Sequence, residues 1–375
     1  MAKEFAVFFS LLKSGLWGKG NLDICIDGTT DWNYMYQLAQ EQSVQGLLLQ
    51  GIDWFKVQGS KFNILQELLL QWIGEVQQIE RRNKEMNVFV ADLIEKLRKN
   101  EIYTILVKGQ GIAQCYEKPL WRCSGDIDLF LSDDNYQKAK SFLMPMASSV
   151  EEEYVREKHL GMTIDGWVVE LHGHLYSGLS SKVERELDRL QEDTFYGGQV
   201  RSWMNGQTQI ILLKAENDVY YVFTHILQHF YKEGVGLRQI CDWCRLLYTY
   251  RDSLNYGLLE QQIRRAGLMS EWKAFYNLAS RYLGMPDFGS GLTVHDSRFD
   301  KKADRIMEFI LKSGNMGHNR DMSHFSKYPY LIRKCVSMSR RISDLINHAR
   351  IFPLDSLRFF PRIMFNGVRS AMKGE

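Results

Sequence analysis

The spacing of apolar residues changes abruptly near residue 100, and this change constrains the fold of the 375-residue chain more than any other feature. From Asn63 to Asn100 the apolar residues recur at intervals of three and four, which is the period of a helix with one buried face. From Ile102 a short β-branched run follows and ends at Gly109, which favours a strand. The sequence therefore predicts one long helix, or two packed helices, leading directly into a sheet.

The middle of the chain continues with alternating patterns. Residues 126–131, DIDLFL, alternate polar and apolar side chains and predict a second strand. Asp133 and Asp134 follow as candidate N-caps of a helix over residues 135–146. Two further alternating runs flank the pair Asp165-Gly166, and this pair strongly indicates a hairpin turn.

Beyond about residue 210 the spacing returns to that of amphipathic helices. The order of helices, strands and helices predicts an α+β fold, in which a small mixed β-sheet core is flanked by N-terminal and C-terminal helices. The Gly/Ser/Asp-rich residues 284–297 are a plausible linker. We divide the chain into an N-terminal helical region (1–98), an α/β core (99–210), a helical region packed on the core (211–290) and a basic helical C-terminal region (291–375).

The cysteines and the terminal segment limit where the protein can work. Six cysteines are too few and too scattered for a disulfide framework. Cys241 and Cys244 form a lone CxxC inside a helical pattern, so we expect them to be packing residues rather than zinc ligands. The first residues include Glu4 and lack a cleavage site for a signal peptidase, and the chain has no apolar stretch long enough for a transmembrane helix. We therefore expect a cytoplasmic protein.

The pair Asp126 and Asp128 is the clearest candidate for chemistry. On a strand, residues two positions apart point to the same face, so both carboxylates project together. Two negative charges at this distance repel each other unless a cation lies between them, and Mg²⁺ (or Mn²⁺) prefers such oxygen ligands. A pair of acids on a solvated strand remains the alternative interpretation.

A turn rich in glycine precedes this pair. Lys108, Gly109 and Gln110 lie where the predicted strand meets a helix. Glycine lets the backbone approach a ligand closely, and the N–H groups of a helix start attract phosphate. The alternative is that glycine serves the turn geometry alone.

Glu170 is a candidate third acid. It alternates on its own predicted strand with apolar residues that face the other way. A carboxylate from a neighbouring strand would complete a cluster able to hold two metal ions. His172 and His174 follow on the same face, either as groups that support the ligands or as histidines that simply form hydrogen bonds.

The segment from Lys108 to Leu131 carries a resemblance to known proteins. Its string KG(x)GIAxxYxxPxxRxxGDIDLFL, followed by the strand ELHxxL, resembles the uncharacterised nucleotidyltransferase family of the polymerase-β-type superfamily. It is also similar to the KGG…R-x-S-x-DID segment of abortive-infection and toxin nucleotidyltransferases. The resemblance spans roughly residues 30–250. It continues into the helical region at His225, His229, Arg238 and Asp242.

The resemblance implies a mixed sheet whose strands hold the catalytic metals, with the helical part covering the nucleotide. Asp126 and Asp128 match the metal-binding pair of the family and Glu170 matches the third acid. The implied cofactor is Mg²⁺ (or Mn²⁺). His172, His225, Arg238 and Asp242 are secondary candidates for the site.

The resemblance also implies contacts with the nucleotide. Lys108 and Gly109 match the turn that approaches the phosphates, and Arg122 matches the basic residue before the acidic pair. Gln110 departs from the wider superfamily, because a serine or a second glycine usually stands there. Lys108, or the hydroxyl of Ser124, would then supply the missing phosphate contact.

The expected function is metal-dependent transfer of a nucleoside monophosphate from an NTP to an acceptor hydroxyl or phosphate, with release of pyrophosphate. The acceptor stays open between RNA, including the end of a tRNA, a small molecule and a protein side chain. A catalytically inactive nucleotide-binding accessory or sensor protein is the alternative.

Residues 300–375 contain 15 basic and 7 acidic residues, in a chain whose formal net charge is only +2. Such a basic tail suits a polyanion such as RNA, anionic lipid or nucleotide, although a solvated helical face is the simpler explanation. Aromatic residues alternate with arginines over 351–369, as in single-strand binders and in helices that lie on a membrane. We expect this segment to pack back on the helical region instead of contacting a membrane.

Overall fold

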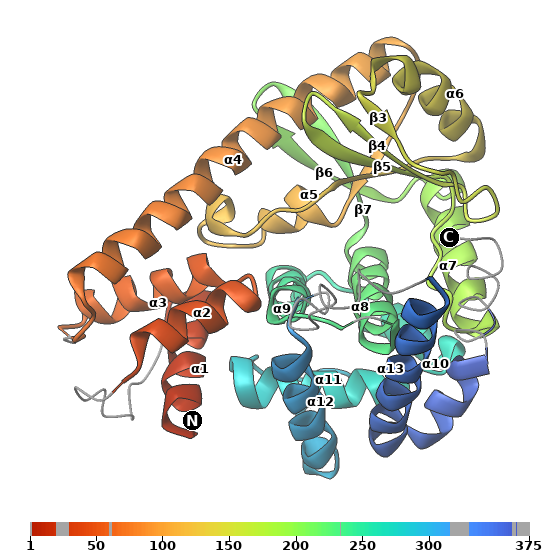
Figure 1. Ribbon diagram of the computed structural model, residues 1–375. Coiled ribbons are helices and arrows are strands. Elements are labelled where there is room, and N and C mark those ends of the chain that lie inside the picture. The colour runs from red at the N-terminus through yellow and green to blue at the C-terminus, as the bar shows by residue number, and fades with distance from the viewer. Residues whose placement is uncertain are drawn as a thin grey trace.

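A sheet and a bundle of helices form the two ends of the protein, and one long helix runs along both (Figure 1). The structure is a computed structural model that describes residues 2–19, 30–59, 62–232, 234–315, 330–361 and 365. The N-terminal helices are α1 (Ala2–Trp17), α2 (Trp32–Glu41) and α3 (Gln45–Val57). α1 and α3 approach closely, because Gly15 and Gly51 each lie directly against a backbone carbonyl of the other helix.

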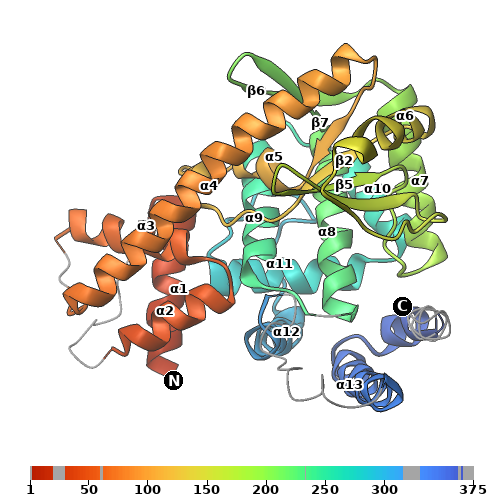
Figure 2. The ribbon, with the colours of Figure 1, turned by 45° about the horizontal axis from the view of Figure 1, so that its top comes forward.

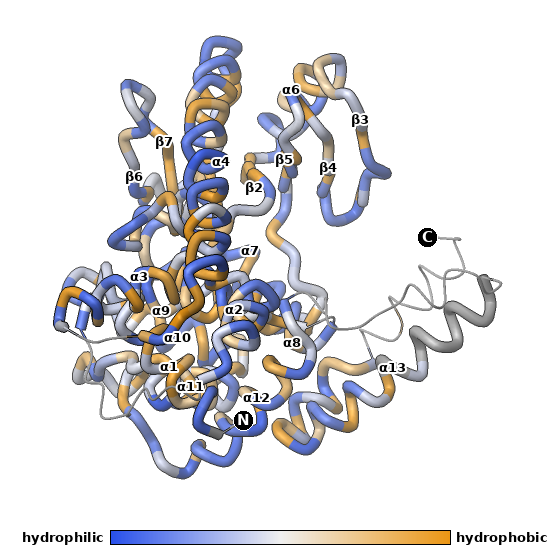
Figure 3. The backbone as a smooth tube through the Cα atoms, turned by 60° about the vertical axis from the view of Figure 1, so that its left-hand side comes forward, coloured by the Kyte–Doolittle hydropathy of each residue, from blue (hydrophilic) through white to orange (hydrophobic). Residues whose placement is uncertain are grey.

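The long helix α4 (Gln66–Lys99) joins the two ends of the protein. It is one continuous helix of 34 residues, so the first of the two expectations from the sequence is confirmed. Its first half buries Trp72 and Val76 against the N-terminal helices, and its second half buries Met86 and Val90 against the sheet. Figure 3 shows hydrophobic and hydrophilic positions alternating around this helix, as a period of 3.6 residues requires.

The sheet has seven strands in the order β3-β4-β5-β2-β1-β7-β6. β2 pairs with β5, and β1 with β7, in parallel, whereas the other neighbours are antiparallel. The sheet is therefore mixed, and the predicted α+β class is confirmed. The strands are β1 (Ile105–Val107), β2 (Ile127–Phe130), β3 (Ser149–Val150), β4 (His159–Ile164), β5 (Trp167–His172), β6 (Val200–Asn205) and β7 (Thr208–Leu213).

The two faces of the sheet meet different parts of the protein: α4 lies over one face, and the helical bundle with α8 (Ala215–Lys232) and α9 (Leu237–Tyr250) lies on the other side (Figure 2). One face packs on α4 and on α6 (Asp133–Leu143) through an apolar core that includes Ile127, Leu129, Val169 and Leu171. The opposite face carries Asp128, Glu170 and His172, which alternate with those core residues. The apolar half of the alternation thus fixes which way the polar half points.

The hairpin predicted at Asp165-Gly166 is confirmed between β4 and β5. Both turn residues have positive φ, 50° and 82°, as a two-residue hairpin turn of type I′ requires. The N-cap of α6 corrects the sequence-based prediction. Asp133 and Asp134 lie in the first turn of the helix, and Ser132, whose backbone is extended, takes the N-cap position.

Two elements inside the core were not expected from the sequence. α7 (Ser181–Tyr196) follows β5, and the hairpin of β6 and β7 extends the sheet beyond β1. The boundary drawn at residue 210 falls inside β7, and the division of the chain into four regions stays a prediction.

The second half of the chain is helical, as expected. Its helices form an apolar core in which the side chains of Cys241 and Cys244 are fully buried, so both are packing residues. Phe352 and Phe359 of the basic C-terminal region are buried in the same core, whereas Leu354, Leu357 and Phe365 are exposed, so this segment packs back only in part. Ile363 and Met364 lie outside the described residues. The helices are α8 (Ala215–Lys232), α9 (Leu237–Tyr250), α10 (Tyr256–Ala266), α11 (Met269–Leu283), α12 (Asp300–Ser313) and α13 (Tyr330–Ile351).

Among the residues that the structure describes, none of the helices combines the length and the apolar character that a membrane span requires.

Candidate metal centre

Three carboxylates meet on the polar face of the sheet. β2 and β5 are neighbours in parallel, and their register places Asp128 directly beside Glu170. Asp126 precedes β2 by one residue and points the same way as Asp128. One carboxylate oxygen from each of the three residues lies within 4.8 Å of the other two. The sequence-based prediction brought these three acids together, and the structure places them close enough to share a cation.

Lys108 connects the turn after β1 to this cluster. Its Nζ lies 2.7 Å from Oδ1 of Asp128, whose side chain is only 1% exposed. Lys108 has φ 57° and ψ −146°, a backbone conformation that residues other than glycine rarely adopt. Gly109 follows with φ 42°, and a Cβ there would lie 3.5 Å from the carbonyl oxygen of Asp126. This strained turn holds the lysine against the acidic pair.

Two histidines complete the polar face. Nε2 of His172 lies 2.8 Å from Oδ1 of Asp128 and 3.4 Å from Oε2 of Glu170. Nε2 of His159 lies 3.1 Å from the same oxygen of Glu170. Burial acts to raise the pKa of Glu170, but the hydrogen bonds from His159 and His172 outweigh this effect and lower the pKa.

His159 was missed in the sequence, although the turn signal could have identified it. A two-residue turn at Asp165-Gly166 pairs residues at equal distances on either side of the turn, and it pairs His159 with His172. Residues opposite each other on antiparallel strands point to the same face. The same signal that predicted the hairpin therefore implied a second histidine beside the first.

The charges of this site shift pKa values in opposite directions. The charge of Asp128, together with burial, raises the pKa of Asp126. Burial acts to raise the pKa of Asp128, but the ammonium of Lys108 and the hydrogen bond from His172 lower it. Burial acts to lower the pKa of Lys108, and the charge of Asp128 outweighs it and raises the pKa. One carboxylate is held ionised while its neighbour resists ionisation, which is the condition that a divalent cation relieves.

Helix α8 bounds the site on the side of the helical bundle. The ring of Tyr221 lies 6.0 Å from Nζ of Lys108. His225 follows one turn later, with its Nε2 3.1 Å from Nε2 of His229. Burial, and next the charge of Lys108, lower the pKa of His225 well below its usual value. His225 thus lies close enough to Lys108 to be affected by its charge, and its role as a secondary site residue stays a prediction.

Arg122, Arg238 and Asp242 form a second group that is held together by its own hydrogen bonds. Nε and Nη2 of Arg122 donate to the two oxygens of Asp242, each at 2.7 Å, and the hydroxyl of Tyr116 donates to Oδ1 at 2.7 Å. Nη1 of Arg122 and Nη1 of Arg238 both donate to the carbonyl of Cys123. This network ties the loop before β2 to α9.

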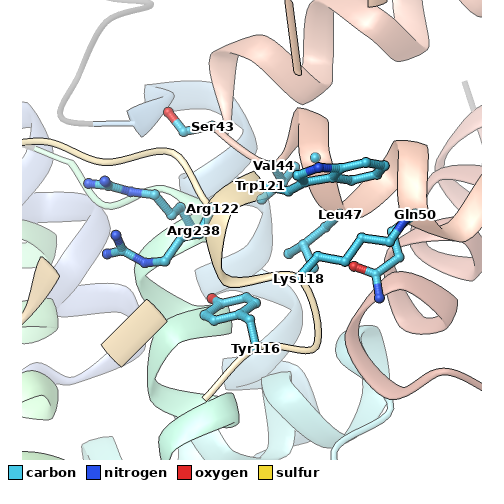
Figure 4. Close-up of a pocket in the computed structure, with 10 residues that line it drawn as sticks. Ser43, Val44, Leu47, Gln50, Tyr116, Lys118, Trp121, Arg122 and Arg238 are labelled. Atoms are coloured by element: carbon cyan, nitrogen blue, oxygen red, sulfur yellow. The ribbon is translucent and has the colours of Figure 1, made fainter. Parts of the chain in front are cut away.

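A small pocket lies beside this second group (Figure 4). The start of α3, the segment 116–122 and α9 line it, and Arg122 and Arg238 lie on the same side of it. The ammonium of Lys118 stacks on the ring of Trp121 at 3.6 Å from the ring centre. The pocket is basic, and the cation groups that line it are engaged with protein partners.

The remaining predicted residues are placed as follows. The side chain of Gln110 turns away from the carboxylates, because its Nε2 donates to Oδ1 of Asn83 on α4 at 2.9 Å. Ser124 lies in the loop that leads into β2. His174 bonds Oδ1 of Asp188 at 2.7 Å rather than a residue of the carboxylate cluster. The roles of these residues in nucleotide binding stay predictions.

The mixed sheet gathers three carboxylates beside a lysine, a donor set that could hold a divalent cation. The chain matches the model of a family described as uncharacterised nucleotidyltransferase over residues 28–284, which is more than half of its length. The chain therefore belongs to this uncharacterised nucleotidyltransferase family. A search of curated proteins and a search of solved structures each found no match.

Proposed function

We propose that the protein is a metal-dependent nucleotidyltransferase that moves a nucleoside monophosphate from an NTP to an acceptor hydroxyl or phosphate and releases pyrophosphate. The observation that carries the proposal is the cluster of Asp126, Asp128 and Glu170, whose ligand atoms lie within 4.8 Å of one another on adjacent strands. The family match supports the same reaction class. A likeness to the polymerase-β-type superfamily and to abortive-infection nucleotidyltransferases is part of this proposal.

The donor set fits a hard divalent cation. Three carboxylates offer only oxygen ligands, and Mg²⁺ (or Mn²⁺) takes such ligands together with the phosphates of a nucleotide. The repulsion that raises the pKa of Asp126 is relieved when a cation binds between it and Asp128. When bound, the cation supplies charge neutralisation at the transferred phosphoryl group and lowers the pKa of the attacking hydroxyl.

The neighbouring side chains would position the substrates and neutralise the negative charge of the phosphates. Lys108 sits next to Asp128 on a strained turn, so its ammonium is fixed where the phosphate groups of an NTP would enter. The ring nitrogen of His172 donates to Asp128 and holds this carboxylate in one orientation. Glu170 is held ionised by its two histidine partners, and we propose that it holds the metal and orients the acceptor.

We further propose that the nucleotide phosphates contact the N–H groups of the turn at Gly109, with the hydroxyl of Ser124 as a second donor. The turn packs against the carbonyl of Asp126, so a phosphate bound there lies beside the acidic pair. Tyr221 and His225 of α8 form the opposite wall. Arg122, with its guanidinium bound to Asp242, acts in this proposal by fixing the loop that carries Ser124.

The test is release of pyrophosphate from each of the four NTPs in the presence of Mg²⁺ and a panel of acceptors. The panel contains RNA with a free 3′ end, tRNA, small hydroxyl compounds and protein. Wild type should release pyrophosphate with one combination, and Asp126→Asn should lower the rate at least about 100-fold. Full activity in Asp126→Asn would refute the proposal.

A nucleotide-binding accessory or sensor protein is the second candidate. Asp128 already has two partners, the ammonium of Lys108 and the ring nitrogen of His172, and Gln110 takes the place of the residue that usually contacts phosphate. Both features suit binding without turnover. A sensor would bind the NTP and leave it intact, whereas an enzyme consumes it, so the nucleotide remaining after long incubation distinguishes the two.

A further inference from the structure

We propose a second cation site beside the carboxylate cluster, formed by His159, Glu170 and His172, which binds a transition metal of the Zn²⁺ type. Glu170 belongs to both sites and bridges them. The proposal stands on the geometry of the three side chains and does not rest on the proposed function. No residue of the sequence-based metal set other than Glu170 contributes to this site.

The backbone brings the two histidines together. β4 and β5 are joined by the two-residue turn at Asp165-Gly166, and their register pairs His159 directly with His172. Glu170 lies two residues before His172 and therefore projects from the same face. The rings of the two histidines are 4.8 Å apart, centre to centre, and tilted by 33°. Rigid strands rather than a loop thus hold all three side chains.

The distances suit a metal between the three groups. Nε2 of His159 lies 3.1 Å, and Nε2 of His172 lies 3.4 Å, from Oε2 of Glu170. Zn²⁺ binds histidine nitrogen and carboxylate oxygen at about 2.0–2.1 Å, and tetrahedral geometry then separates any two ligand atoms by about 3.3 Å. These two contacts therefore have the length of ligand-to-ligand edges. Metal binding uses the lone pair of Nε2 of His172, so it replaces the hydrogen bond of this nitrogen to Asp128.

The chemistry of the donors differs from that of the carboxylate site. Two imidazoles and one carboxylate suit Zn²⁺ and related transition metals, whereas Mg²⁺ prefers oxygen ligands alone. The side chains of His159, Glu170 and His172 are 26%, 22% and 12% exposed, so an ion can enter and a fourth ligand can bind. The two sites would thus select different ions although they share one residue.

Glu151 borders this site but lies outside the group of three ligands. Gly161 pairs with Glu170 across the two strands, and a Cβ at Gly161 would lie 2.5 Å from Oε2 of Glu151. Paired residues point to the same face, so the carboxylate of Glu151 occupies the side-chain space opposite Glu170. Glycine at position 161 is what leaves room for this carboxylate near the site.

The test uses Co²⁺, whose visible absorption bands are strong in four-coordinate geometry and weak in six-coordinate geometry. The full chain is stripped with a chelator and titrated with Co²⁺ in excess Mg²⁺, and Zn²⁺ is then added as a competitor. The variants are His159→Gln and His172→Gln. The matched control is His174→Gln, because His174 also bonds a carboxylate, Oδ1 of Asp188 at 2.7 Å, but stands outside the cluster.

Wild type and His174→Gln should bind one Co²⁺ with strong visible bands that Zn²⁺ abolishes. His159→Gln and His172→Gln should each weaken Co²⁺ binding at least about tenfold. The absence of strong bands in wild type would overturn the proposal, and so would equal Co²⁺ affinity in His159→Gln and His174→Gln. The absence of strong bands in wild type is decisive by itself, because this result does not depend on whether any variant folds.

Asp126→Asn separates this site from the proposed function, because Asp126 is not one of its three ligands. This variant should keep the Co²⁺ bands. If the bands depend on His159 but no NTP is consumed, the proposed function fails and the metal site stands. If an NTP is consumed but wild type gives no bands, the metal site fails and the proposed function stands.

Discussion

Arg122 and Asp242 form a buried ion pair between the loop before β2 and helix α9, and replacing Asp242 should destabilise the protein strongly. Both side chains are only 6% exposed. The pair is bidentate, with two contacts of 2.7 Å, and the hydroxyl of Tyr116 adds a third donor to the same carboxylate. Asp242→Asn keeps the shape of the side chain but leaves the charged guanidinium of Arg122 buried without a counter-charge.

The cost of breaking one partner of a buried pair is about 3–5 kcal/mol. The matched control is Asp304→Asn. Oδ1 of Asp304 also accepts from a tyrosine, Tyr282 at 2.8 Å, and from an arginine, Arg281 at 3.2 Å, but this pair is 40% and 37% exposed. An exposed pair contributes about 0–1 kcal/mol. Both carboxylates accept from one tyrosine and one arginine, and they differ in burial and in the second arginine contact that only Asp242 receives.

The assay is unfolding by urea, followed by tryptophan fluorescence. Asp242→Asn should lower the free energy of unfolding several times more than Asp304→Asn does. The double variant Arg122→Met/Asp242→Leu should recover part of the loss, because apolar side chains can replace a buried pair at little cost. Equal losses in Asp242→Asn and Asp304→Asn would refute the reasoning.

Two further predictions concern stability. Gly15→Ala should destabilise the protein by about 1–3 kcal/mol, because the added Cβ would lie 2.0 Å from the carbonyl oxygen of Leu47. The control Gly74→Ala has nothing within 4 Å of the added Cβ and should be neutral or stabilising by up to about 1 kcal/mol. Urea midpoints of the two variants check this, and a neutral Gly15→Ala would contradict the close packing of α1 on α3. Burial, and next the charge of Asp355, raise the pKa of Glu271 from 4.5 to about 8, so its contribution to stability is fully present below pH 4.5 and is lost as the pH rises through 8. Glu271→Gln removes this loss and should exceed wild type in stability at pH 8 by up to about 5 kcal/mol, from about 1.4 kcal/mol per pH unit, with a smaller difference at pH 5; a difference independent of pH would contradict the assigned cause.

The local elements of the fold could be predicted where one short signal decides them. The helical period from Gln66 to Lys99 and the turn at Asp165-Gly166 involve only neighbours in sequence, and both expectations are confirmed. The hairpin of β6 and β7 was missed although it also has a local signal. Gly206, with φ 61°, opens its two-residue turn, and glycine in this position is typical of such turns.

The candidate site was predictable in part. Alternation along each strand indicated that Asp126 and Asp128 share a face and that Glu170 faces away from its apolar neighbours. It could not show that β2 and β5 lie side by side, because a parallel pair has no turn between its strands and depends on long-range packing. The family resemblance supplied that step.

Contacts between distant segments were beyond the sequence. Arg122 and Asp242 are 120 positions apart, so neither pattern nor spacing could indicate that they pair. The prediction that Arg122 binds nucleotide considered only its place before the acidic pair. Gln110 is a similar case. Its amide donates to Asn83 on α4, 27 positions earlier in the chain, and this buried contact could not be read from the sequence around Gln110.

The most direct test of the account is whether Mg²⁺ and an NTP bind together at the acidic cluster. Thermal unfolding is measured with each of the four NTPs, with and without Mg²⁺, for wild type, Asp126→Asn and the control Asp304→Asn. The account predicts that one NTP raises the unfolding temperature of wild type and of Asp304→Asn only when Mg²⁺ is present, and that Asp126→Asn loses this rise. A rise of equal size in Asp126→Asn, or no rise with any NTP in wild type, would contradict the account.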